Sequence, residues 1–239
     1  MVEKIHCRAF GYCFTLILNF INMLLLIKAV MTPMSPELET IFFMKSKYIT
    51  VWNLVIQCIY AVIGLICDGP VILKIEEKGF NKILDYLRWY RSVFYSGLVW
   101  PCGLFIFTAF WPFFLYDRDL VFPASIDTVL SPVSNHIMHS VILPIMLWEF
   151  VFAERRVGKP DKLTKLHVIM LLIAYNSVII VSYIKTGVWP YPMLRMSYGT
   201  IYFPLIFVYF VILSILSYYA QWYIADVFKL NEKPTRKVK

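Results

Sequence analysis

A threonine and two histidines are the side chains of this sequence best suited to chemistry in an apolar environment. The segment VSNHIMHSVILP, residues 133–144, places His136 and His139 at the start of a long apolar run, although the chain contains only 4 histidines. Thr50 lies at the start of another apolar run, in KYITVWNLVIQ. A hydroxyl becomes a useful nucleophile when a neutral imidazole accepts its proton. These residue types therefore suggest a nucleophile and a base, provided that the fold brings them together.

The same two histidines could instead bind a metal ion. His136 and His139 are three residues apart, and Asp117, Asp119 and Asp127 precede them in one connection. Imidazole and carboxylate groups are common ligands of zinc and related divalent metals. No G-x-S-x-G, H-E-x-x-H or G-x-x-x-x-G-K-[ST] motif occurs in the chain, so serine hydrolases, zincins and P-loop proteins lack their signatures here.

The elements that must position these residues are membrane-spanning helices. Hydrophobic residues make up 60% of the 239 residues, above the roughly 45–50% typical of soluble domains. Several apolar stretches have about 20 residues, the length that crosses a hydrocarbon core. We therefore predict an all-α, polytopic membrane protein with a single transmembrane helical domain over residues 1–239. The expected spans are residues 11–30, 48–66, 93–115, 136–152, 166–184 and 199–224, followed by a basic cytosolic tail at 225–239.

The distribution of positive charge predicts the orientation of these spans. Of the Lys and Arg residues outside the spans, 17 lie on the side of the N-terminus and 5 on the other side. Cytoplasmic segments carry the excess of positive charge, so both termini are expected in the cytosol. The net charge of +8 then follows from topology and anionic lipid, and no nucleic-acid partner is needed to explain it. We expect a multi-pass protein of the cell membrane or the endoplasmic reticulum.

Polar groups inside the spans mark candidate functional positions, because they are costly in lipid. Thr50, Asn53 and Gln57 follow a spacing that stacks them on one helix face, where they either pack helices together or form a site. With the predicted topology, Thr50 and His139 are each about three residues into their helices and within roughly 5 Å of the same outer interface. Lys28 lies near the outer end of the first span. It either extends to the interface or pairs with an anionic ligand.

Three blocks of sequence resemble one known family. They are KYITVWNLVIQ at 47–57, FWPFFLYDRDLVFP at 110–123 running on to NHIMHSVILP at 135–144, and TGVWPYP at 186–192. The family is that of the androgen-induced and androgen-dependent TFPI-regulating membrane proteins, which are threonine hydrolases of fatty acid esters of hydroxy fatty acids. The middle block is the most specific, because aromatic, acidic and histidine positions agree together.

The resemblance implies a role for individual residues. Thr50 matches the nucleophile of the family and His139 its catalytic histidine, whereas His136 matches a histidine of unassigned role. The implied substrate is a lipid ester that arrives from the bilayer among membrane lipids, and the implied chemistry needs no cofactor and no metal. Further candidates for substrate binding are Lys28, Asn53, Asn135, His136 and Trp189.

Two other functions remain open from the residues alone. The chain could be a non-catalytic lipid-binding or scaffolding membrane protein, in which the Thr50 and His139 positions only pack helices. It could also be a metal-dependent membrane hydrolase. The sequence does not predict an oligomeric state.

Overall fold

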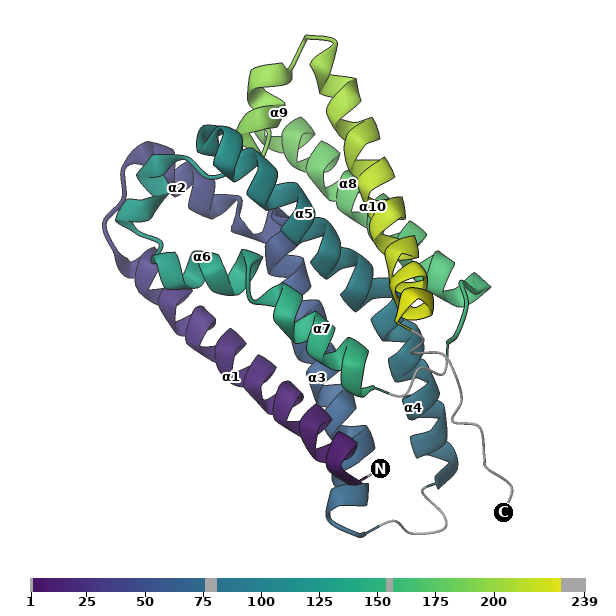
Figure 1. The fold of residues 1–239 in the computed structure, drawn as a ribbon. Helices are drawn as coiled ribbons and strands as arrows, with labels where there is room; N and C mark the ends of the chain where they lie inside the picture. The colour runs from purple at the N-terminus through teal and green to yellow at the C-terminus, as the bar shows by residue number, and fades with distance from the viewer. Residues whose placement is uncertain (1, 76–80, 154–156, 229–239) are drawn as a thin grey trace, which may run out of the picture.

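The protein is a bundle of helices joined by short connections. The computed structural model describes residues 2–75, 81–153 and 157–228. Within this part of the chain, 6 helical segments are long and apolar enough to cross a membrane, and they pack into one bundle (Figure 1). The predicted all-α, polytopic fold class is confirmed. The helices are α1 (Val2–Met31), α2 (Pro36–Phe43), η1 (Lys45–Lys47), α3 (Ile49–Ile72), α4 (Asn81–Phe94), η2 (Tyr95–Val99), α5 (Trp100–Tyr116), η3 (Arg118–Leu120), η4 (Ala124–Thr128), α6 (Pro132–His139), α7 (Ile142–Phe152), α8 (Lys162–Thr186), α9 (Pro192–Ser197) and α10 (Tyr202–Val227).

The spans agree with the prediction in number and order but differ in their limits. Most observed helices extend beyond the apolar stretches, because helical hydrogen bonding continues where the sequence becomes polar. The third span is the largest case, since α4, the π-helical turn η2 and α5 form one continuous helical segment from Lys82 to Tyr116. From residue 229 onward, the predicted basic tail lies outside the described residues. The observed spans are Lys4–Met31, Ile49–Ile72, Lys82–Tyr116, Pro132–Phe152, Lys162–Thr186 and Tyr202–Val227.

The fourth span departs most from the prediction, because it begins earlier and is broken. Helix α6 begins at Pro132, with the Ser131 side chain accepting a hydrogen bond from the Ser134 amide. A serine N-cap followed by proline is a favoured helix start. The helix then ends at His139, and α7 leaves in a different direction (Figure 1). Pro144 explains the break, because a proline removes the hydrogen bond to the carbonyl four residues earlier, here that of Ser140.

A buried ionic network holds together the end of the bundle at which α1 begins. The Arg8 guanidinium donates to both Asp68 carboxylate oxygens, at 2.8 and 2.9 Å, and Arg91 donates to the same carboxylate at 3.1 Å. Nearby, Glu149 accepts hydrogen bonds from Tyr12 and Tyr60. Buried charges are tolerated when paired and hydrogen-bonded in this way. The network joins α1, α3, α4 and α7.

The connection between α5 and α6 folds over the end of the bundle that is away from the start of α1 (Figure 1). Arg118 forms a salt bridge of 2.8 Å with Asp127, and its guanidinium lies over the rings of Phe114 and Phe122. These contacts fix the two short helices η3 and η4. They also place Phe122 and neighbouring apolar side chains against a cavity beneath the connection.

Candidate active site

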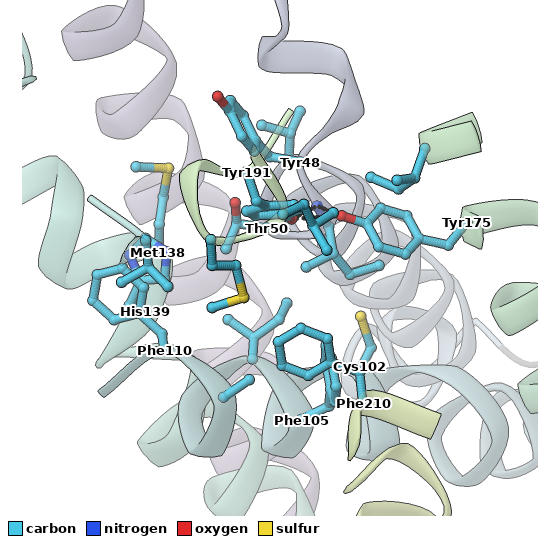
Figure 2. A pocket seen from close by; sticks show the side chains of 18 of the residues that line it. Tyr48, Thr50, Cys102, Phe105, Phe110, Met138, His139, Tyr175, Tyr191 and Phe210 are labelled. Atoms are coloured by element: carbon cyan, nitrogen blue, oxygen red, sulfur yellow. Dashed lines mark hydrogen bonds between the residues drawn. The ribbon is translucent and has the colours of Figure 1, made fainter. Parts of the chain in front are cut away.

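One large cavity lies inside the bundle, beneath the α5–α6 connection. Its volume is about 240 Å³, and its walls come from α3, α5, α6, α8, α10 and the α5–α6 connection. Most of the lining side chains are apolar, which suits the hydrocarbon chains of a lipid. Thr50 and His139 are both on its wall, Thr50 from α3 and His139 from α6 (Figure 2).

The imidazole of His139 is held in one orientation from two directions. Its ring stacks on Phe110 with 3.6 Å between ring centroids and 13° between planes. Its Nδ1 lies 3.0 Å from the backbone carbonyl oxygen of Asn135. A carbonyl can only accept a hydrogen bond, so Nδ1 carries the proton and Nε2 of the neutral ring has the free lone pair. The hydrogen bond to the backbone therefore leaves Nε2 as the ring nitrogen that can accept a proton.

The break after α6 is stabilised by a second side chain of α5. The Trp111 indole N–H donates to the His139 carbonyl oxygen at 3.2 Å. The last carbonyls of a helix lack partners within the helix, so this bond satisfies one of them. Phe110 and Trp111 thus hold the ring and the backbone of His139 respectively.

Thr50 occupies the first turn of α3, as the second residue of that helix. The preceding amide, that of Ile49, donates to the hydroxyl oxygens of Tyr175 and Tyr191 at 3.1 and 3.2 Å. Thr50 itself is half-buried. The predicted position of Thr50 near the start of its helix is confirmed.

The predicted position of His139 within its helix is wrong. It is the last residue of α6 rather than about the third residue of a helix that starts at His136, because the serine N-cap and Pro132 start the helix earlier. The tilt of α6 and the break still place His139 on the cavity that Thr50 lines. Among the described residues, no hydrogen bond joins the two side chains directly, although both line the cavity (Figure 2).

Three other predicted site residues lie around this pair. Asn135 is buried, and its backbone carbonyl orients His139. His136 is exposed, with its Nδ1 2.9 Å from the Ser140 hydroxyl and its ring stacked on Trp111. Asn53 is fully buried on α3 but is not a cavity residue, and its amide has no hydrogen-bond partner within the described part of the chain.

The two remaining predicted residues lie away from the cavity wall. Lys28 is exposed on α1, and Trp189 is buried against Tyr183, with 4.0 Å between ring centroids. The lysine that does line the cavity is Lys45, in the turn η1 just before Thr50. Lys45 was not predicted as a site residue, because a lysine in a connection between spans is typical of any membrane protein.

The predicted metal alternative has little structural support. Among the described residues, no three His, Cys, Asp or Glu side chains converge as metal ligands do. Asp127 pairs instead with Arg118, and Asp117 accepts a hydrogen bond from the Asp119 amide. His136 is engaged with Ser140, as described above.

Fold and sequence together define the class of this protein. Residues 11–225 match the FAR-17a/AIG1-like protein family, and the chain belongs to that family. This agrees with the resemblance given by the three sequence blocks.

The chain is also similar to individual proteins. The chain is 39% identical over 148 residues to the human androgen-dependent TFPI-regulating protein and 32% identical over 150 residues to its rat counterpart. It is 27% identical over 156 residues to the human androgen-induced gene 1 protein. These matches cover 62% of this chain and 61–63% of each relative. No solved structure matches the chain.

Proposed function

We propose that this protein is a membrane-embedded hydrolase of lipid esters, with Thr50 as nucleophile and His139 as base. The observation that carries the proposal is the shared cavity, on which a threonine hydroxyl and an imidazole with a free Nε2 lie together. The resemblance to threonine hydrolases supplies the substrate class, fatty acid esters of hydroxy fatty acids.

The bond-making and proton-transfer steps of the reaction use these two side chains and water. The Thr50 hydroxyl oxygen attacks the ester carbonyl carbon while Nε2 of His139 accepts the hydroxyl proton. The tetrahedral intermediate then collapses, and the imidazolium gives that proton to the departing oxygen of the hydroxy fatty acid. Water attacks the acyl-threonine, with Nε2 again accepting a proton, and the fatty acid leaves as Thr50 is restored. The hydrogen bond between the two side chains forms when the ester is bound, since such bonds are often long in unliganded sites.

The cavity provides what such a substrate needs. Its walls are mostly apolar, which suits contact with hydrocarbon chains. Lys45 is the cationic residue on its wall and suits the free carboxylate of the hydroxy acid. Lys45 thus replaces Lys28, which the sequence suggested as the partner of an anionic ligand. We further propose that the protein resides in the cell membrane or the endoplasmic reticulum and that both of its termini lie in the cytosol.

The test is hydrolysis of a branched fatty acid ester of a hydroxy fatty acid by membranes containing equal amounts of each variant. Thr50→Ala and His139→Ala should reduce hydrolysis to the background of empty membranes, and Thr50→Ser should retain part of it. Thr40→Ala is the matched control, because Thr40 is exposed on α2 and its hydroxyl bonds to the Pro36 carbonyl. A wild-type protein without hydrolase activity would instead support the non-catalytic lipid-binding role.

A further inference from the structure

Two tyrosine hydroxyls meet beside the first turn of α3. Tyr175 comes from α8 and Tyr191 from the connection just before α9, and their hydroxyl oxygens lie 2.5 Å apart. Both oxygens accept from the Ile49 amide, and both side chains line the cavity (Figure 2). Segments far apart in the sequence thus place two phenols at the residue that precedes Thr50.

One of the two hydroxyl protons in this cluster has no acceptor among the described residues. The two hydroxyls carry two protons, and one proton forms the bond between the two oxygens. The Ile49 amide supplies its own proton to the cluster. Within the described chain, no further acceptor is bonded to either hydroxyl, so the second phenol proton is available to a ligand. Burial raises the pKa of the Tyr191 phenol, which keeps that group protonated at neutral pH.

The available proton lies close to the proposed nucleophile. Ile49 and Thr50 are consecutive, so their Cα atoms are about 3.8 Å apart. The hydroxyl pair is held at the amide of the first of these residues, on the same cavity wall as the side chain of the second. A carbonyl attacked by Thr50 becomes an oxyanion, and a fixed donor near that oxygen stabilises the tetrahedral intermediate.

We propose that the Tyr175–Tyr191 hydroxyl pair is the oxyanion donor of this site. The proposal rests on the hydrolase function argued above and supplies a component that the Thr50–His139 pair lacks. The Ile49 amide fixes the two oxygens, and one hydroxyl polarises the other, so the donor is set before the substrate binds. No charge is required, which suits a cavity with apolar walls.

The test compares wild type with the Tyr175→Phe and Tyr191→Phe variants, singly and together. Each substitution keeps the ring and removes only the hydroxyl. The double variant should lose about 100- to 1,000-fold in kcat, the range for loss of an oxyanion donor. Its affinity for a long-chain alkyl boronic acid, which forms a tetrahedral adduct with the nucleophile, should fall by a similar factor. Its affinity for an ether analogue of the substrate should stay within threefold of wild type.

The control is Tyr183→Phe, because Tyr183 lies on α8, as Tyr175 does, but is not part of the cavity wall. This variant should keep the wild-type kcat and boronic acid affinity. If the double variant does not fold, at least one single variant must lose tenfold or more in both measurements.

Two results would overturn the inference while leaving the hydrolase intact. One is a folded double variant, or a pair of single variants, with kcat within threefold of wild type. The other is a uniform loss of affinity for ether and boronic acid alike, which indicates that the hydroxyls only support the cavity wall and the start of α3. A wild-type protein that hydrolyses no lipid ester refutes the proposed function instead, so the two failures are distinguishable.

Discussion

The imidazole of His139 lies flat on the ring of Phe110, with the ring centroids 3.6 Å apart. The contact joins α6 to α5 at the place where the fourth span breaks. Together with the hydrogen bond from Nδ1 to the Asn135 carbonyl, it leaves the imidazole little freedom to rotate. The position of the proposed base is therefore set by an aromatic ring and a backbone carbonyl.

Phe110→Leu should lower kcat by about tenfold while changing KM little. Leucine fills much of the same space but has no flat face to hold the imidazole, so the near-attack geometry is populated less often. Hydrolysis by purified protein in detergent measures both constants. Phe107→Leu is the control, because Phe107 is half-buried on α5 and does not line the cavity. Equal kcat values for the two variants would contradict this role of Phe110.

Lys45→Met should weaken binding of substrates with a free carboxylate. The lysine is exposed, so its pairing with a carboxylate resembles a surface ion pair and should change KM by about two- to fivefold. The methyl ester of the same substrate lacks the charge and should show no change. Lys28→Met is the matched control, since Lys28 is exposed but is not part of the cavity wall. A larger effect of Lys28→Met would restore the assignment made from sequence.

Gly97→Ala should destabilise the contact between the third span and α8. A Cβ atom at position 97 would lie 2.9 Å from the His167 Cβ and 3.1 Å from the Thr164 carbonyl oxygen, so backbone must shift. Overpacking of this kind costs about 1–3 kcal/mol, and thermal unfolding in detergent should report it. Gly69→Ala is the control, since a Cβ there meets nothing within 4 Å. Equal melting temperatures of the two variants would show that α8 can move away.

Asp68→Asn should reduce stability without changing the chemistry of the folded fraction. The substitution leaves Arg8 and Arg91 buried without their shared carboxylate, and breaking a buried pair costs about 3–5 kcal/mol. The measurement is the yield of folded protein together with kcat per folded molecule. Asp85→Asn is the control, because Asp85 is exposed and 3.4 Å from Arg88. A normal yield of Asp68→Asn would mean that the network is not needed for folding.

Much of the architecture could be predicted from sequence, because span length and hydrophobicity are local properties. The apolar run that contains Thr50 begins where α3 begins, so both the helix and the place of Thr50 in its first turn followed from the pattern. The early start of α6 was also encoded, by Ser131–Pro132, and the break after His139 was encoded by Pro144. Scanning for apolar length alone does not detect these signals.

The parts of the site that could not be predicted depend on contacts between distant segments. Tyr175 lies in the middle of an apolar span, and Tyr191 lies in a connection between spans that is rich in aromatic residues. Tyrosine is common in both settings, so neither position indicates a shared hydrogen bond. Only the packing of α8 and the segment before α9 against α3 brings the two hydroxyls to the Ile49 amide.

The central claim is that Thr50 carries the acyl group during hydrolysis. The most direct measurement is mass spectrometry of protein quenched in acid during turnover of a slowly hydrolysed lipid ester, with proteolysis and sequencing of the peptide that contains residue 50. We predict an added acyl mass on Thr50 in the wild type, and none in Thr50→Ala or His139→Ala. Hydrolysis with the acyl group on another residue, or hydrolysis that persists in Thr50→Ala, would contradict the account.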